Sequence, residues 1–195
     1  MIVTVGAPGP FYFMRPDKRI FYHTDDPLNG IYNEMCGHRW LMDHIEWFEH
    51  EPYLGLEHYR RAFDHTPEEI DQLLDEHDII VKNEHGPLGC TNLQALQCCS
   101  RYGINYLPQA TQWVERWPEL REQAERDRHY GCCMFITRPD RYKEMMSDAF
   151  KYIDEMLKYP NLQRSVIGYF CELILVPFIV KAHNRDIFVG RVTVK

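Results

Sequence analysis

Residues 53–63 read YLGLEHYRRAF, in which an apolar run ends in a cluster of side chains that could do chemistry. Glu57 and His58 supply a carboxylate oxygen and an imidazole nitrogen, both of which bind divalent cations. Arg60 and Arg61 supply guanidinium groups, which stay charged and bind a diphosphate through paired hydrogen bonds. The residue types therefore fit a site for a metal ion and a diphosphate. On these residues alone, a strand end with surface salt bridges is an equally good interpretation.

The placement of these side chains depends on where the strand ends. Side chains alternate between the two faces of a strand, which would send Glu57, Tyr59 and Arg61 to one side and His58 and Arg60 to the other. The alternation can break beyond the last residue of the strand, so the sequence does not assign the faces.

Glu172 is a second candidate, because it lies in the otherwise apolar segment GYFCELI. A carboxylate in such a segment is either buried with a partner or faces a cleft. In a cleft, burial would raise its pKa toward the range that suits a general base. The alternative is a structural acid paired with Arg164 or Arg60, and the residues alone slightly favour it.

The composition limits the classes of function. Of the 195 residues, 45 % are hydrophobic and 13 % aromatic, which is enough for a packed core in one domain spanning residues 1–195. The formal net charge is −7 and the sequence pI is about 5.8. The protein is therefore not expected to bind nucleic acid through its overall charge. A bound anion must therefore be held by local positive groups or by a metal ion.

The cysteine pattern and the apolar runs predict a soluble cytoplasmic protein. Seven cysteines, including two adjacent pairs and no CxxC, indicate reduced thiols rather than a disulfide framework. The first residues, MIVTVGAPGPF, lack the basic region and the long apolar core of a signal peptide. The longest apolar run, at 173–180, is shorter than the roughly 20 residues that span a bilayer.

Strands and helices are predicted to alternate along the chain, which is typical of an α/β sandwich with a largely parallel sheet. Ligands of such sheets bind at the carboxyl ends of the strands, where residues 57–61 are expected. Strands are predicted at 2–5, 53–56, 78–82, 132–137 and 186–194. Helices are predicted at 32–48, 66–77, 91–102, 109–127 with a break at Pro118, 138–159, and 165–183 with a bend near Pro177.

Several segments together resemble a known family. YLGLEHYRRAF looks like the GL-x-HYRR-x-F hallmark of a domain-of-unknown-function family of short glycosyltransferase-like proteins. Its members come from capsule and lipopolysaccharide gene clusters and from large DNA viruses. The order and spacing of the motifs hold from about residue 20 to 180. The other matching segments are NGIYNEMCGHRW at 29–40, DIIVKN at 78–83, YGCCMFI at 130–136 and RSVIGYFCELI at 164–174.

The resemblance implies a GT-A-like fold, with a central, mostly parallel mixed sheet flanked by helices. It also implies a nucleotide-sugar donor, with UDP favoured, and Mn²⁺ or Mg²⁺ as cofactor. LEHY lies where an Asp-x-Asp metal motif is expected, so Glu57 takes the place of the first acid and Tyr59 replaces the second. Either Glu57 or His58 then binds the metal with a ligand from elsewhere, or Arg60 and Arg61 carry part of the phosphate charge.

The resemblance also assigns roles to other residues. Glu172 matches the carboxylate that acts as base in inverting enzymes of this fold. The end of the first strand, Thr4, Val5, Gly6 and Ala7, would face the nucleoside. Asp78 is a weaker nucleotide-binding candidate, because a structural role suits it equally well. Cys133 replaces an Asn of the family, which implies altered specificity if that Asn contacts the sugar or the acceptor.

The predicted function is transfer of a hexose or deoxyhexose from a nucleotide-diphosphate donor to a glycan acceptor. Inversion at the anomeric carbon is favoured, because Glu172 offers a base. Two alternatives are a nucleotide-binding module without its own catalysis and a protein-interaction domain with a polar strand end. Because the chain ends earlier than many relatives, it is also compatible with being one module of a longer polypeptide.

Overall fold

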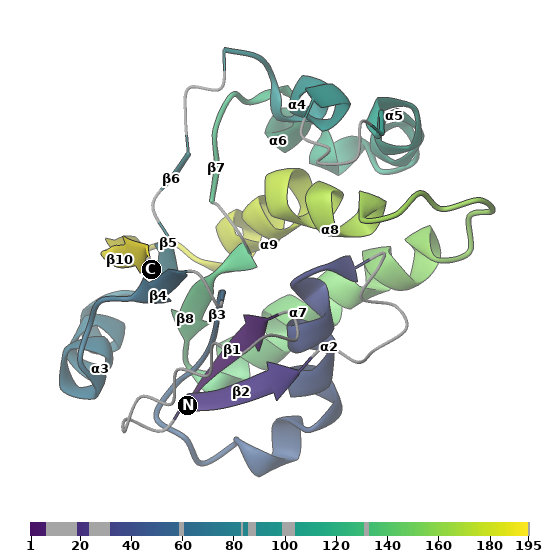
Figure 1. The fold of residues 1–195 in the computed structure, drawn as a ribbon. Helices are drawn as coiled ribbons and strands as arrows, with labels where there is room; N and C mark the ends of the chain where they lie inside the picture. The colour runs from purple at the N-terminus through teal and green to yellow at the C-terminus, as the bar shows by residue number, and fades with distance from the viewer. Residues whose placement is uncertain are drawn as a thin grey trace.

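The computed structural model describes residues 1–6, 19–23, 32–58, 61–82, 84–85, 89–98, 104–130 and 133–194, with the backbone alone at 3–6, 19–23, 84–85, 98 and 194. The described residues form an α/β structure around an eight-stranded mixed sheet (Figure 1). The strands of this sheet are β1 (Ile2–Gly6), β2 (Arg19–His23), β3 (Leu54–His58), β4 (Arg61–Phe63), β5 (Ile79–Lys82), β8 (Phe135–Thr137), β9 (Ile187–Gly190) and β10 (Val192–Val194).

The expected α/β class with a mixed sheet is confirmed, and the described strands pair in both directions. Among the described strands, the pairs β1–β2, β1–β3 and β5–β9 are parallel. The pairs β3–β4, β3–β8, β5–β8 and β10–β4 are antiparallel. The chain leaves the carboxyl end of β5 in β6 (Glu84–His85) and returns beside it in β7 (His129–Tyr130). Strand β8 therefore enters the sheet from the edge where β5 ends and must run in the opposite direction.

Helices cover both faces of the sheet. On one face, Ile70 and Leu74 of helix α3 (Pro67–Glu76) pack in a small core with Ile80 and Ile136. The other face carries the large core, to which Ile79, Val81 and most of the helices contribute (Figure 1). These helices are α2 (Met35–Asp43), α4 (Asn92–Cys98), α5 (Leu107–Arg116), α6 (Arg121–Glu125), α7 (Pro139–Met156), α8 (Val166–Phe170) and α9 (Val176–His183).

Helix starts and breaks that depend on local signals lie where the sequence predicts them. Thr66 caps α3 in a capping box, in which the Glu69 N–H donates to Thr66 Oγ1 at 3.2 Å and the Thr66 N–H donates to Glu69 Oε2 at 2.9 Å. Helix α5 ends before Pro118, which opens the short 3₁₀ helix η2 (Pro118–Leu120). The helix predicted at 32–48 is shorter, because α2 is followed by the 3₁₀ helix η1 (Ile45–Trp47).

The sequence predicts a bend near Pro177 in the segment 165–183. The irregular turn that the structure shows in this segment lies before Pro177. Residues Cys171–Leu175 form a π-helical turn, η4, between α8 and α9. Pro177 lies in the first turn of α9, where proline is tolerated. The stretch Val166–His183 is long and apolar enough to cross a membrane by length and composition, but 67 % of it is buried inside the protein. That burial is typical of a core helix.

The strand predicted at 132–137 begins only at Phe135, because Cys133 adopts a left-handed backbone conformation with φ 50°. Cys133 is buried, and its carbonyl accepts a hydrogen bond from His38 Nε2 at 2.9 Å. Asn tolerates the left-handed conformation better than most residues. The backbone at position 133 therefore suits Asn better than Cys.

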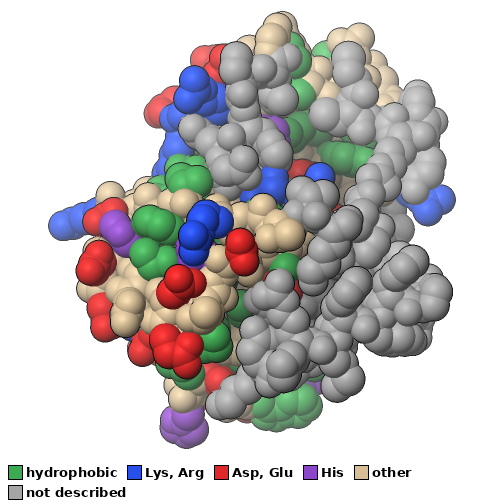
Figure 2. All heavy atoms as spheres, turned by 60° about the vertical axis from the view of Figure 1, so that its left-hand side comes forward, with side chains coloured by type: hydrophobic (Ala, Val, Ile, Leu, Met, Phe, Trp, Pro, Cys, Tyr) green, Lys and Arg blue, Asp and Glu red, His purple; other side chains and the backbone are tan. Residues whose placement is uncertain are grey.

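The surface agrees with the acidic composition. Figure 2 brings the left-hand side of Figure 1 forward and shows acidic side chains gathered over α3. The exposed acids of this helix are Glu68, Glu69, Asp71, Asp75 and Glu76. This face is unsuited to binding a polyanion. The cysteines for which the structure gives a state are free thiols, namely Cys36, Cys90, Cys133 and Cys171.

Candidate functional site

The carboxyl ends of β1 and β3 lie side by side. In the parallel register of these strands, Thr4 is level with Glu57, and Val5 is level with His58. Gly6 is the last residue of β1, whereas Ala7 lies outside the described residues. The structure thus brings the first strand end and the polar end of β3 together at one edge of the sheet. Parallel α/β sheets bind ligands at such edges.

Strand β3 is longer than the predicted 53–56, and this decides where its polar side chains point. Because β3 continues through His58, the alternation of faces holds for Glu57 and His58. Gly55, two residues before Glu57, packs against Ile136 of the small core on the α3 face. His58 lies on the opposite face, where its Nε2 is 3.2 Å from Oε1 of Glu34, the residue that precedes α2. Both side chains are buried.

The Glu57 carboxylate is engaged by the strand that follows it. Arg61, at the start of β4, is directly opposite His58, and Tyr59 and Arg60 between them lie outside the described residues. The N–H of Phe63 in β4 donates to Glu57 Oε2 at 3.2 Å. Glu57 therefore helps to fix the β3–β4 hairpin, whatever else it binds.

The placement of Glu57 and His58 does not fit a metal site shared by the two. Adjacent residues of one strand direct their ligand atoms to opposite faces of the sheet. Over the part of the chain that the structure describes, there is also no group of three or more His, Cys, Asp or Glu side chains that could hold a metal ion. A metal site here would need ligands beyond this pair.

Glu172 lies one turn beyond a close contact between α8 and the segment that precedes α2. A Cβ on Gly168 would lie 2.6–2.8 Å from the side chain of Asn33, so the two backbones approach closely there. Glu172 follows Gly168 by four residues, about one turn, and is half-buried. The contact with Asn33 thus lies one turn from Glu172, and Asn33 directly precedes Glu34. Glu172 also lies in the π-helical turn, a feature that is frequent at functional sites.

Lys82 is a residue of the carboxyl edge of the sheet that the sequence reasoning missed. It ends β5 and is buried. Leu56 of β3 and Val81 of β5 both pair with Phe135, so the next residues, Glu57 and Lys82, are level with one another. The sequence contained a signal for Lys82, because this lysine ends the apolar run DIIVK. A buried ammonium group needs a partner or a ligand, so a lysine in that position indicates a possible binding residue.

Asp78 lies at the other edge of the sheet. Leu54 and Ile79 both pair with Thr137, so Asp78 is at the amino end of β5, away from Glu57 and His58. Its Oδ2 accepts hydrogen bonds from the N–H groups of Arg185 and Asp186 at 2.8 and 3.2 Å. Slight burial acts to raise the pKa of Asp78, but these two bonds and the nearby Arg141 outweigh it and lower the pKa. The geometry therefore favours the structural role of Asp78.

Comparison with known proteins identifies the family. The profile of a family described as a domain of unknown function, DUF4422, matches residues 25–184, a range that contains Glu34, Glu57, His58 and Glu172. The chain belongs to the DUF4422 family. The resemblance that the HYRR segment indicates is thereby confirmed. No curated protein matches this DUF4422 chain.

A solved structure shares the fold of the DUF4422 chain. It is described as the apo structure of WbbM, a bifunctional glycosyltransferase, and superposes with a TM-score of 0.73 at 16 % sequence identity. The match covers 99 % of the DUF4422 chain and 45 % of the WbbM chain. The chain thus spans less than half the length of that protein, and the likeness establishes a glycosyltransferase-like fold.

The contact between Gly168 and Asn33 leads to a testable prediction. We expect Gly168→Ala to lower the free energy of unfolding of the DUF4422 chain by about 1–3 kcal/mol, because its Cβ would overlap the Asn33 side chain. Asn33→Gly should restore most of the loss, because it removes those atoms and glycine accepts the φ of 50° found there. Urea unfolding of the two single variants and the double variant gives the coupling. Additive losses would contradict this packing.

Proposed function

We propose that the chain is a glycosyltransferase of GT-A type that moves a hexose or deoxyhexose from a nucleotide-diphosphate donor, with UDP favoured, to a glycan acceptor. The observation that carries the proposal is the β1–β3 register, which gathers Thr4, Val5, Glu57 and His58 at one carboxyl edge. The fold shared with part of a glycosyltransferase supports it. The acidic composition argues against a nucleic acid as substrate.

In this proposal, the backbone of residues 4–6 faces the base and ribose of the donor. The diphosphate is neutralised by positive groups at the same edge: Arg60 and Arg61 from the HYRR segment, and Lys82 from the end of β5. His58 ends β3 on the other face of the sheet from Glu57, where Glu34 holds it. Because Glu57 and His58 do not fit a shared metal site, we assign no step to Mn²⁺ or Mg²⁺ and treat metal dependence as a question for experiment.

Glu172 acts as the base in this proposal. Its carboxylate takes the proton of an acceptor hydroxyl while that oxygen forms a bond to the anomeric carbon. The bond from the anomeric carbon to the diphosphate oxygen breaks at the same time, and the nucleoside diphosphate leaves with the electron pair. Attack from the side opposite the leaving group inverts the anomeric carbon. The positive groups at the sheet edge stabilise the negative charge that develops on the diphosphate.

One observation favours the alternative of a nucleotide-binding module without catalysis. Glu57 and His58, the two most suggestive polar residues, both have partners inside the protein. In a module of this kind, the same edge would hold the nucleotide, while a partner enzyme would carry out transfer.

Thermal-shift measurements with UDP, GDP and CMP, each with and without Mn²⁺, test both the glycosyltransferase and the nucleotide-binding module. We expect UDP to raise the melting temperature, because a ligand that binds only the native state stabilises it. Release of free sugar from a UDP-sugar would then identify catalysis, whereas binding without release would identify the module. A melting temperature unchanged by every nucleotide would contradict both. A cytoplasmic location is part of the proposal and rests on the free thiols.

A further inference from the structure

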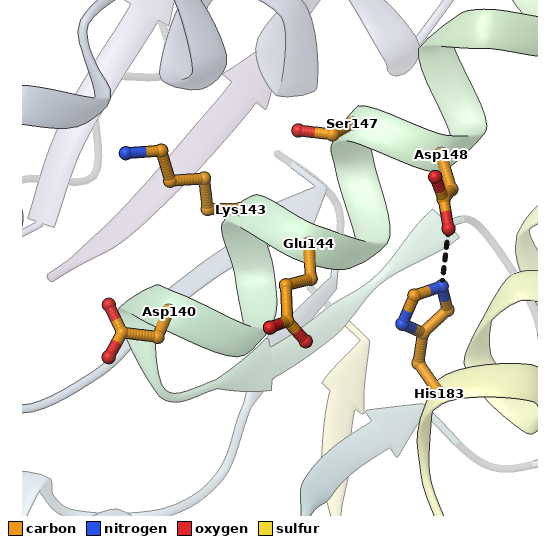
Figure 3. A pocket seen from close by; sticks show the side chains of 6 residues that line it. All are labelled: Asp140, Lys143, Glu144, Ser147, Asp148 and His183. Atoms are coloured by element: carbon orange, nitrogen blue, oxygen red, sulfur yellow. Dashed lines mark hydrogen bonds and ion pairs between the residues drawn. The ribbon is translucent and has the colours of Figure 1, made fainter.

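A groove lies on another part of the molecule, between α7, α9 and η2. It consists of two adjoining hollows of about 520 and 560 Å³, which share Asp148 and His183. Figure 3 shows the second hollow, where Asp140, Glu144 and Asp148 follow one another along α7 and His183 reaches Asp148 from the end of α9. Helix α9 ends just before β9, which begins level with Ile79 at the amino edge of the sheet. The groove is thus separate from the carboxyl edge where the donor is proposed to bind.

One wall of the groove is aromatic. Trp117, Tyr152 and Phe178 line the first hollow and are only partly buried. The rings of Trp117 and Tyr152 are 5.3 Å apart at 81°, and those of Tyr152 and Phe178 are 6.5 Å apart at 83°. The edge-to-face packing holds the rings in place and leaves part of their surface accessible. Such surfaces suit a ligand that has apolar C–H faces.

Polar groups stand beside the aromatic rings. The Tyr152 hydroxyl donates to Glu119 Oε1 at 2.8 Å, and burial together with Glu119 raises the pKa of Tyr152 to about 12. Asp148 is bound by Lys151 at 2.6 Å and by His183 at 3.0 Å. The hydrogen bond from Lys151 is the main cause that lowers the pKa of Asp148. Neutral hydroxyl and ionised carboxylate groups therefore border the hollow together.

The charges of the groove select among ligands. Its lining carries five carboxylates against two lysines and His183, so a nucleotide diphosphate or another polyanion is disfavoured there. A pyranose ring combines apolar C–H faces with hydroxyl groups and carries no charge. It can pack on aromatic rings while its hydroxyls donate to carboxylates. The hollows, each of more than 500 Å³, are within the size range of small-ligand sites.

We propose that this groove binds a neutral oligosaccharide and holds the acceptor glycan at a distance from the reaction site. The proposal rests on the proposed glycosyltransferase function, which supplies a glycan as the acceptor. The Trp117–Tyr152–Phe178 wall packs against the sugar rings. The carboxylates of Glu119 and Asp148 accept hydrogen bonds from the sugar hydroxyls.

Electrophoresis of the native protein through gels that contain dextran, mannan or galactan tests this inference. We expect at least one of these neutral polysaccharides to retard the wild-type protein. Trp117→Ala should weaken binding at least tenfold, because it removes a stacking surface. Ala182→Met should weaken binding by a similar factor, because the longer side chain fills the groove from an exposed position on α9. This second variant keeps the test valid if Trp117→Ala folds poorly. Trp47→Ala is the matched control, because Trp47 is 65 % exposed and lies outside the groove.

Three results would overturn the proposal. One is a wild-type protein that none of the three polysaccharides retards. Another is retardation that Trp117→Ala and Ala182→Met both retain at the wild-type level, whatever the effect of Trp47→Ala. The third is concentration-dependent dimerisation that Ala182→Met abolishes, without glycan binding, which would make the groove a protein interface. The UDP thermal shift of both groove variants should equal that of the wild type. A wild-type protein that binds glycan but no nucleotide would count against the proposed function and leave the groove in place.

Discussion

Replacing Glu172 by Gln is expected to lower the rate of sugar transfer by a factor of at least about 10², the low end of what a positioned base contributes. The amide has the shape of the carboxylate but cannot accept the proton of the acceptor hydroxyl. Nucleotide binding should change little, because the groups proposed to hold the diphosphate lie at the ends of β3, β4 and β5. The loss should therefore appear in kcat, with little change in the UDP thermal shift.

The measurement is transfer of sugar from a UDP-sugar to a glycan acceptor, with the UDP thermal shift recorded on the same preparations. Glu122→Gln is the matched control, because Glu122 is an exposed acid on α6. It should leave both quantities at the wild-type level. Turnover by Glu172→Gln at the wild-type rate would remove Glu172 from the mechanism. Loss of the UDP shift together with turnover would assign Glu172 to binding or to structure.

Lowering the pH from about 6.5 to about 4 is expected to reduce the free energy of unfolding by roughly 3 kcal/mol through His38 alone. Burial lowers the pKa of His38 to about 4 from a usual value near 6.5, although the Cys133 carbonyl and Glu34 act in the opposite direction. Between these two pH values, the unfolded chain binds a proton that the folded chain does not. The stabilisation is therefore complete above pH 6.5 and is lost as the pH falls toward 4.

The hydrogen bonds of His38 explain why it stays neutral. The Cys133 carbonyl can only accept, so Nε2 carries the hydrogen, and Nδ1 accepts from the Tyr142 hydroxyl at 2.7 Å. Protonation of Nδ1 would place two donors face to face and oblige that hydroxyl to rotate away. The imidazole also stacks on Phe135 at 5.0 Å, with no exposed surface. The charged form therefore has no solvent, and its new hydrogen at Nδ1 meets a hydroxyl that acts as a donor in the neutral state.

Urea unfolding between pH 7 and pH 4.5 measures this effect when the wild type is compared with His38→Gln. The glutamine amide can donate to the Cys133 carbonyl and accept from Tyr142, but it does not titrate. Its stability should be lower than that of the wild type at pH 7 and should fall less steeply on acidification. Equal pH slopes for the two proteins would show that other groups account for the acid sensitivity, such as His65, whose pKa is also lowered by burial.

Features set by neighbours in the sequence could be predicted, and features set by distant segments could not. Thr66 and Pro118 mark helix boundaries through their own chemistry, so α3 and the break after α5 lie where expected. The direction of β8 depends on where the chain re-enters after α6, which no local pattern encodes. The left-handed backbone conformation of Cys133 could not be predicted either, because cysteine has no particular preference for that conformation.

The candidate site shows the same division. Glu57, His58 and Glu172 could be found because polar groups stand out at the ends of apolar runs or within them. The Glu34–His58 pair could not, because it joins the start of a helix to a strand that follows much later. The opposite orientations of Glu57 and His58 required knowing that β3 continues to residue 58. Lys82 became significant only through the shared pairing of β3 and β5 with β8.

The pairing of β4 with β10 has a consequence for the biogenesis of the protein. Strand β4 holds Glu57 through the Phe63 N–H, yet its own partner, Val192–Val194, is synthesised well over a hundred residues later. A nascent chain that lacks this segment would leave the edge of β4 unpaired, and such edges are prone to aberrant association. The proposed binding edge would thus be completed late in translation, after residues 192–194 have emerged.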